Sequence, residues 1–357
     1  MKSSSRVPSL DGWRALSIIL VLLGHEIKMG GAFGFTEARD QLSTYFGWHY
    51  YGVQIFFVIS GFIITYLLLQ EEKATGTISF RMFYLRRFFR IIPALGTYLA
   101  CVFLLNLIFH GETIGPVAWF KSIFFLGNFS FGGSPWSTGH LWSLSVEEQY
   151  YFFWPLVFFH KRLRTFLPVL FILLGPFFRV IDYRYLGSIG VFSFFTRGDS
   201  ILIGSLFAIY RDHPAFTKAL KFSNPILIVT AFCLIAEKLL IPNTAFLTVP
   251  FTMTFFSLSV VVLITRSFSP NSVLFRILNT RGLIWIGGIS YSLYLWQQLF
   301  FPVSVLGLML PTLFPFNFMF AFLFAWLSSR FIEKPILAWR RRRYDRTTGG
   351  REMVVGT

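Results

Sequence analysis

The sequence has little charge and almost no cysteine. Only 13% of its 357 residues are charged, whereas 55% are hydrophobic and 20% aromatic, and the mean hydropathy is +0.62. A soluble domain of this length carries about twice that charged fraction, so the composition excludes an ordinary soluble enzyme. Cys101 and Cys233 both lie in apolar runs and are typical of small buried residues rather than of a disulfide or a metal pair.

Several signatures of nucleotide and metal chemistry are missing. The sequence has no Walker loop, no GxGxxG before a helix, no HExxH, no CxxC cluster and no GxSxG elbow. We therefore expect neither an ATP-driven pump nor a Rossmann dinucleotide enzyme nor a zinc protease, and we expect no metal site. The apolar run after Ser9 has no small-residue cleavage site, so we expect no signal peptide.

Long apolar segments are present instead. They predict an all-α, polytopic bundle of about ten transmembrane helices in residues 1–339, followed by a basic, unfolded cytoplasmic tail in 340–357. Residues 117–131 form a further apolar patch that is either re-entrant or interfacial. The ten expected segments are 13–29, 49–69, 91–110, 146–160, 165–181, 199–210, 223–241, 245–265, 283–303 and 315–332.

The net charge of +16 could suggest nucleic acid, but the basic residues lie between the apolar segments. With both termini in the cytoplasm, 24 Lys and Arg residues lie inside, and seven, Arg179 and Arg197 among them, lie outside. This asymmetry is typical of membrane topology. We therefore expect a multi-pass protein of the plasma (inner) membrane whose partners include membrane lipid and exclude nucleic acid.

Two ionisable residues lie inside the first apolar segment. Arg14 and His25 are eleven residues apart, which places them about three helical turns and about 16 Å apart on nearly one face. Such groups usually face a protein interior or a water-filled path. The alternative is that Arg14 reaches to the interface and that His25 is a hydrogen-bonded packing residue.

The segment from His140 to Tyr151, HLWSLSVEEQYY, brings polar groups to the outer end of the fourth expected helix. Ser143 or Ser145 could cap that helix, with Glu147 and Glu148 in its first turn. Alternatively, Glu147 faces inward and pairs with the imidazole of His25. In that case His140, Ser143 and Gln149 would line a site.

Arginines gather before the third expected helix, in the run from Arg81 to Pro93. Arg86 and Arg90 share a helix face, and Arg87 is offset. Guanidinium groups bind phosphate in bidentate fashion, so the cluster could hold a phosphate-rich donor. Ordinary cytoplasmic charge is the alternative.

Two further segments carry polar side chains inside apolar runs. Gln54 and Ser60 lie in the second expected helix, where Ser60-Gly61 would also permit close helix contact. Tyr291 and Tyr294 lie in the run GGISYSLYLWQQ, and their hydroxyls need partners or could orient an acceptor. Both segments are consistent with packing and with lining a site.

At these residues the chain resembles the acyltransferase-3 family of membrane acyltransferases. Five matching pieces occur in family order and cover nearly the whole chain: LDGWRALSIILVLLGH, FFVISGFIIT, RRFFRIIP, HLWSLSVEEQYYFFWP and ISYSLYLW. The resemblance implies transfer of an acyl group, commonly acetyl from acetyl-CoA, to a hydroxyl of a polysaccharide, peptidoglycan, lipid-linked sugar, nodulation factor or macrolide.

The resemblance also implies roles for residues. Arg14 and His25 match the family's R-x10-H pair, and Glu147 matches its recurrent acidic position. The arginines proposed for donor binding match Arg86, Arg87 and Arg90. The family often has His where this chain has Gln297, which speaks against proton transfer at that position. No secreted SGNH hydrolase-like domain follows, so we expect a second transfer step to need another protein.

These expectations combine into one hypothesis: acyl-CoA is the donor substrate with no bound cofactor, and a carbohydrate or glycolipid is the acceptor. His25, oriented by Glu147, deprotonates the acceptor or first receives the acyl group, and Arg14 stabilises negative charge. The rival hypothesis is a transporter or flippase of a polar lipid or glycan, which would use the same charges as a path. A non-catalytic membrane scaffold is a third reading.

Overall fold

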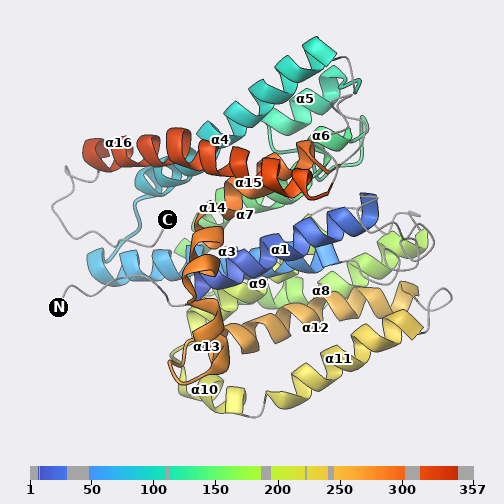
Figure 1. The fold of residues 1–357 in the computed structure, drawn as a ribbon. Coiled ribbons are helices and arrows are strands. Elements are labelled where there is room, and N and C mark those ends of the chain that lie inside the picture. The colour runs from blue at the N-terminus through green and yellow to red at the C-terminus, as the bar shows by residue number, and fades with distance from the viewer. Residues whose placement is uncertain are drawn as a thin grey trace.

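The computed structural model describes residues 7, 9–29, 48–109, 112–185, 194–221, 223–239, 245–301 and 314–344, and every element in these residues is a helix. The elements (Figure 1) are α1 Leu10–Met29, α3 Trp48–Thr75, α4 Phe80–Phe109, α5 Pro116–Ile123, α6 Trp136–Gly139, α7 Leu141–Phe159, α8 Leu163–Tyr185, α9 Phe194–Tyr210, α10 Pro214–Lys221, α11 Asn224–Leu239, α12 Ala245–Arg266, α13 Val273–Leu278, α14 Arg281–Trp296, the 3₁₀ turn η1 Gln297–Leu299, α15 Phe316–Ser328, the π-helical turn η3 Ser329–Glu333, and α16 Lys334–Tyr344.

Each of the ten expected segments overlaps a helix among the described residues, and several of the helices begin or end at other residues. By length and composition, α3, α4 and α8 are able to cross a membrane, and the bent pair α10 and α11 would make a fourth span. The all-helical fold is therefore confirmed, whereas the number of spans and their orientation remain predictions. Helix α16 runs to Tyr344, past the expected boundary at 339, and residues 345–357 of the expected tail lie outside the described residues.

Close glycine contacts fix the centre of the bundle, where α1, α3, α9 and α14 pack together. A Cβ on Gly61 of α3 would lie 1.8 Å from the carbonyl oxygen of Ile201 in α9, and one on Gly204 would lie 2.0 Å from that of Val58. Only glycine permits this approach of two helix backbones. The close contact expected at Ser60-Gly61 is therefore confirmed.

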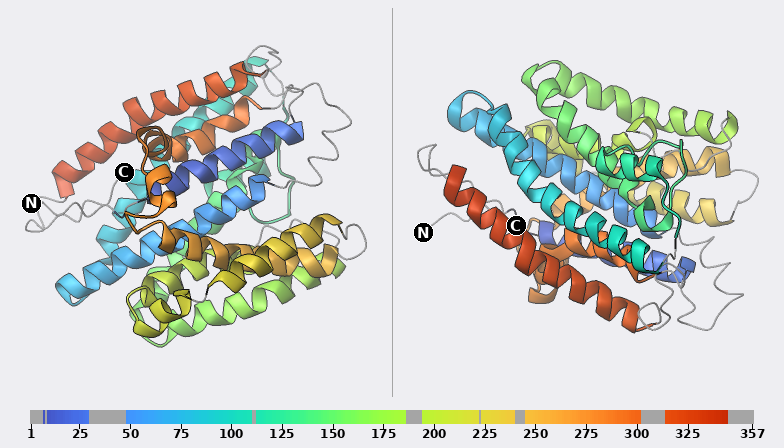
Figure 2. Two further views of the ribbon diagram at one scale, coloured as in Figure 1. Left: turned by 60° about the horizontal axis from the view of Figure 1, so that its bottom comes forward. Right: turned by 90° about the horizontal axis from the view of Figure 1, so that it is seen from above.

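Two groups of helices flank this centre, as Figure 2 shows from two further sides. On one side α8 and α12 pack against α9, α12 also contacts α3, and α11 packs against α12; on the other side α4 packs against α14, η3 and α16. The start of α1 is held by α13, because Gly12 leaves room for the carbonyl of Leu278. The core therefore lies around α1 and α3, where the polar residues described below also lie.

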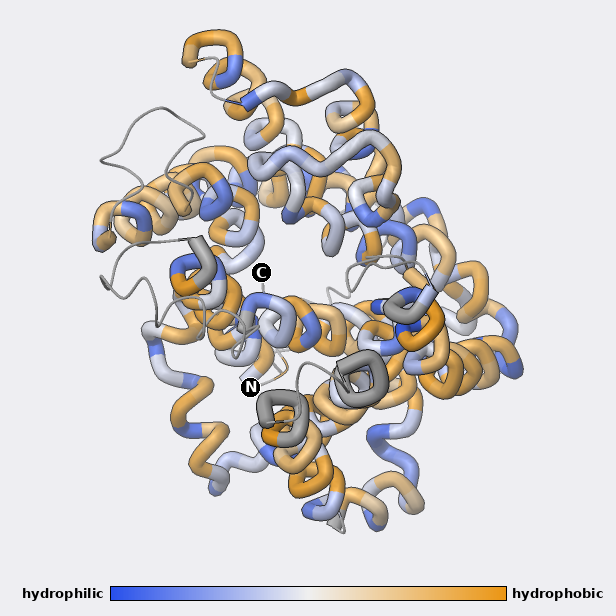
Figure 3. The backbone as a smooth tube through the Cα atoms, turned by 90° about the vertical axis from the view of Figure 1, so that its right-hand side faces the viewer, coloured by the Kyte–Doolittle hydropathy of each residue, from blue (hydrophilic) through white to orange (hydrophobic). Residues whose placement is uncertain are grey.

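The outer helices present apolar side chains outward. Figure 3 shows hydrophobic residues along most of the helical tube, and large side chains on α4, α8 and α11 are exposed, such as Phe103, Leu173 and Phe232. A soluble protein rarely exposes so much contiguous apolar surface. An exterior of this kind suits lipid, which the helices can face because their backbone groups are hydrogen-bonded internally.

Candidate functional site

His25 lies near the end of α1, where η1 follows α14. Its Nδ1 is 2.8 Å from Oε1 of Gln297, which is fully buried. The rings of His49 and Trp136 approach the imidazole, with centroids at 5.4 and 5.7 Å. His25 is thus a packed imidazole with a defined hydrogen-bond partner.

His140 lies beside this imidazole, immediately before α7. Its side chain is 5% exposed, and neither ring nitrogen has a hydrogen-bond partner among the described residues. The ring contacts the rings of Tyr98 and Tyr294, and the carbonyl of Tyr294 lies at the amide of Gln297. We call His25, Gln297, His140 and Trp136 the imidazole centre.

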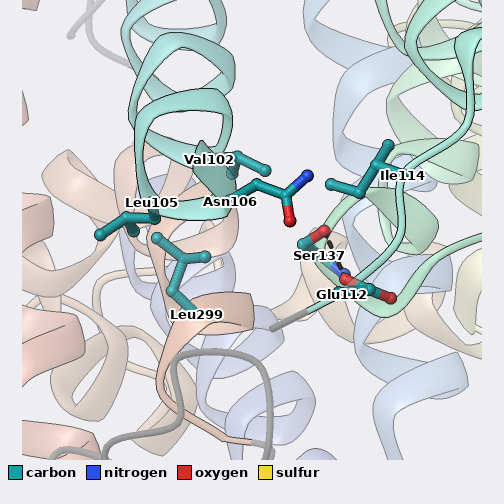
Figure 4. A pocket seen from close by; sticks show the side chains of 7 residues that line it. All are labelled: Val102, Leu105, Asn106, Glu112, Ile114, Ser137 and Leu299. Atoms are coloured by element: carbon teal, nitrogen blue, oxygen red, sulfur yellow. Dashed lines mark hydrogen bonds between the residues drawn. The ribbon is translucent and has the colours of Figure 1, made fainter. Parts of the chain in front are cut away.

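A small pocket opens between α4 and α6 (Figure 4), and Leu299 of η1 also lines it. Its polar lining consists of Asn106, Glu112 and Ser137, and Val102 is part of its apolar wall. The Glu112 carboxylate accepts hydrogen bonds from the backbone N–H of Trp136 and from the N–H and hydroxyl of Ser137. An amide, a carboxylate and a hydroxyl around one hollow are groups that could bind the hydroxyls of a sugar.

A second polar centre lies deeper along the same helices, around Glu147 of α7. The hydroxyl of Tyr151 donates to Glu147 at 3.1 Å and is also hydrogen-bonded to Ser60 of α3. Arg14 and Arg87 both interact electrostatically with Glu147, and the guanidinium of Arg87 lies 5.9 Å from the centre of the Tyr151 ring. We call Arg14, Arg87, Arg90, Glu147 and Tyr151 the arginine centre.

Arg90 extends this centre towards η3. It pairs with Glu333 at 3.7 Å and lies 5.9 Å from the ring of Tyr291, whose hydroxyl donates to the carbonyl of Ile91. Arg86, by contrast, pairs with Glu71 at 2.7 Å. The three expected donor arginines therefore lie together on α4, and two of them already have carboxylate partners.

The expected pair of Glu147 with His25 is wrong. Helix α7 begins at Leu141, so Glu147 lies about 10 Å along the axis from His140. The Glu147 carboxylate instead accepts from Tyr151 and lies near Arg14 and Arg87, whereas Gln297 takes the partner role at His25. The sequence analysis noted Gln297 only as a departure from the family and did not identify it as the partner of His25.

The expected serine caps of α7 are also wrong. The residue at the N-cap position is His140, whose side chain makes no capping hydrogen bond. Ser143 is hydrogen-bonded to the hydroxyl of Tyr294, which also donates to the carbonyl of His140. Ser145 instead donates to the carbonyl of Leu141 within α7 and accepts from the backbone N–H of Gly127, so Ser143 links α7 to α14 and Ser145 links α7 to a loop.

Two further candidate residues, Gln149 and Gln54, lie apart from both polar centres. Gln149 exchanges hydrogen bonds with Asn128 and donates to the carbonyl of Phe125, so it tethers the loop after α5 to α7. Gln54 is 2% exposed, and its Oε1 has no partner among the described residues. No described contact joins Gln149 or Gln54 to either polar centre.

A buried ion pair on α8 and α9 also escaped sequence reasoning. Arg179 makes three contacts of 3.0 Å with the carboxylate of Asp199, and it donates to the carbonyls of Thr196 and Pro250 and to Thr254. Because Arg179 and Arg197 are buried inside helices, counting them as loop charges was wrong. Lys121 is likewise buried inside α5, so the orientation stays a prediction.

Comparison with known proteins gives consistent matches. A family model described as an acyltransferase domain, that of acyltransferase-3, matches residues 7–331. The peptidoglycan O-acetyltransferase OatA of Listeria monocytogenes is 29% identical over 94% of this chain and 56% of its own length. The O-acetyltransferase OatA of Staphylococcus aureus is 30% identical over 85% and 52%. The chain spans about half the length of these curated relatives, and no solved structure matches it.

Proposed function

This chain belongs to the acyltransferase-3 family, and we propose that it is a membrane O-acyltransferase that moves an acyl group, preferably acetyl, from acyl-CoA to a hydroxyl of a glycan or glycolipid. One observation carries the proposal. The imidazole centre and the arginine centre lie on the same helices, separated by about 16 Å along α1. A cationic site for a donor and a base for an acceptor are the two parts that such a transfer needs.

The arginine centre suits the donor. Arg87 and Arg90 lie in the first half of α4, and guanidinium groups bind phosphate oxygens in bidentate fashion. The phosphates of the donor would bind to these guanidinium groups, and its long pantetheine arm would carry the thioester towards His25. Arg14 lies at the same level on α1 and would add positive charge on the path of the arm.

The imidazole centre suits the chemistry. His25 would remove the proton from the acceptor hydroxyl while the oxygen attacks the thioester carbonyl carbon. The carbon–sulfur bond then breaks, and the thiolate takes the proton from the imidazolium. A covalent variant, in which His25 first receives the acyl group and passes it on, uses the same contacts.

The pocket between α4 and α6 would receive the acceptor. Its polar lining adjoins Trp136, whose ring contacts His25, so a sugar held there would have hydroxyls on the imidazole side. The related OatA of Listeria monocytogenes is named for peptidoglycan O-acetylation. This favours an envelope glycan as acceptor and the plasma membrane as the location.

The test measures CoA thiol released by the purified protein in lipid nanodiscs, with and without glycan acceptor. We expect acceptor-dependent release that His25→Ala reduces by at least about 100-fold, the usual contribution of a general base. His213→Ala is the matched control, because His213 is exposed in the turn before α10. Movement of glycan across the bilayer without thiol release would instead support the transporter.

A further inference from the structure

Two adjacent glutamines connect His25 by hydrogen bonds to Trp136 of the short helix α6. We propose that Gln297 and Gln298 are positioning residues that decide which nitrogen of His25 carries the proton. Both are buried, at 0% and 3% exposure, so neither amide can satisfy its groups with bulk water. The effect that we predict on the reaction rate rests on the acyl transfer proposed above. The direction of the hydrogen bonds between the glutamines and His25 does not.

The direction of these hydrogen bonds is set at the backbone carbonyl of Trp136, which can only accept. Nε2 of Gln298 donates to the backbone carbonyl of Trp136 at 2.9 Å. A carbonyl oxygen can only accept, so this end of the Gln298 amide must be its NH₂ group. The indole Nε1–H of Trp136 donates back to the carbonyl of Gln298 at 2.9 Å, which holds the two residues in register.

The second step passes this orientation to Gln297. Because the NH₂ group of Gln298 faces Trp136, its Oε1 faces Gln297 and accepts from Nε2 of Gln297 at 2.9 Å. Nε2 of Gln297 also lies 3.5 Å from the carbonyl of Tyr294. Both neighbours of this nitrogen are acceptors, so the amide of Gln297 has one favourable orientation.

The third step fixes the imidazole. With its NH₂ group turned away, Gln297 presents Oε1 to Nδ1 of His25 at 2.8 Å. An amide oxygen only accepts, so Nδ1 must carry the proton, and in the neutral ring the lone pair is then on Nε2. The amides thus make Nε2 the nitrogen that takes the proton or the acyl group.

This arrangement differs from a carboxylate behind a histidine, because every member is neutral. A carboxylate can accept from a histidine in either of its orientations, whereas a single amide can turn its NH₂ group towards the ring and impose the wrong tautomer. Gln298 prevents that rotation. The inference therefore predicts that Gln298 matters only while residue 297 is an amide.

A double-mutant cycle tests this dependence, with thiol release as the readout. We expect Gln297→Leu to lower kcat by about 10- to 100-fold, the range seen when the hydrogen-bond partner of a metal-ligating histidine is lost, with the KM for donor unchanged. Gln298→Leu should lower kcat by about 3- to 10-fold in the native protein. In the Gln297→Glu background, which keeps an acceptor oxygen, Gln298→Leu should change kcat by less than about twofold.

Tautomer assignment gives an independent readout without substrate. In ¹⁵N-histidine-labelled protein, with the His25 signal identified by its loss in His25→Asn, we expect the Nδ1–H form in the native chain and a mixture in Gln298→Leu. Thr230→Val, which removes a buried hydrogen bond between α11 and α12, controls for general loosening and should leave kcat and tautomer unchanged.

Three results would overturn the inference. These are an Nε2–H tautomer in the native chain, equal losses from Gln298→Leu in both backgrounds, or a Gln297→Glu variant as inactive as Gln297→Leu although its thermal stability is native. A native chain that releases no thiol would refute the proposed function alone, because the tautomer measurement would still decide the role of the amides.

Discussion

Replacing Asp199 by leucine tests how much the bundle depends on the buried pair between α8 and α9. The carboxylate of Asp199 is 1% exposed and accepts from Arg179, from Thr254 and from the backbone N–H of Ser200. Asp199→Leu removes this acceptor and leaves the guanidinium of Arg179 between two backbone carbonyls.

The expected cost follows from the unpaired charge. Removing one partner of a buried ion pair costs about 3–5 kcal/mol, whereas replacing both partners by apolar residues of similar volume is often close to neutral. At about 2 °C per kcal/mol, Asp199→Leu should lower Tm by about 6–10 °C. The double variant Arg179→Met with Asp199→Leu should recover most of that loss.

Thermal unfolding in detergent, followed by the near-ultraviolet signal of the aromatic residues, measures both effects. Asp212→Ala is the control, because Asp212 pairs with Arg211 at an exposed position where ion pairs contribute little. If Asp199→Leu melted with the native protein, or if the double variant melted lower still, the buried pair would not stabilise the bundle as we infer.

Two more predictions concern the helix contact and the arginine centre. Gly61→Ala should lower Tm by several degrees and reduce thiol release, because its Cβ would lie 1.8 Å from the carbonyl of Ile201, whereas Gly96→Ala, whose Cβ would meet open space, should match the native protein. Tyr151→Phe should lower kcat/KM for donor by about 10- to 100-fold through loss of hydrogen bonds of about 1.5–3 kcal/mol to a charged partner. Tyr84→Phe, which loses only an exposed hydrogen bond, should retain native kinetics; equal losses in both tyrosine variants would contradict the role of Tyr151.

Apolar runs located the helices well, because a lipid-facing helix must be apolar over its length. The residues at which the helices begin were predicted less well, because polar residues at the start of a helix interrupt the apolar pattern. Helix α4 begins at Phe80 rather than at 91, and it carries its arginines through Pro93 as one helix. The donor arginines are therefore on the same rigid element as the apolar span, which composition alone did not indicate.

The error at Glu147 has the same origin. The expected helix began at residue 146 and placed Glu147 in its first turn, near the outer end and His25. Since α7 begins at Leu141, Glu147 lies in its second turn, at the level of Arg14. Spacing along one helix gave the separation of Arg14 and His25 correctly, but partners on different helices depend on where each helix begins.

Several ion pairs among the described residues link neighbouring helices. Arg179 joins α8 to α9, Arg164 joins α8 to α3 through Glu72, and Arg90 joins α4 to η3 through Glu333. In a low-dielectric interior such pairs compensate the cost of burying each charge. Their presence inside the bundle therefore has a structural explanation that needs no substrate.

The remaining polar groups are different. Nε of Arg87, Oε1 of Glu148 and both ring nitrogens of His140 are buried and have no hydrogen-bond partner among the described residues. Buried polar groups are almost always satisfied, so exceptions need an explanation. Arg87 and Glu148 belong to the arginine level and His140 to the imidazole centre, while other unsatisfied atoms, such as Oε1 of Gln54, lie outside both centres. Groups that the protein leaves unpaired at these two levels are the ones that a phosphate and a hydroxyl would complete.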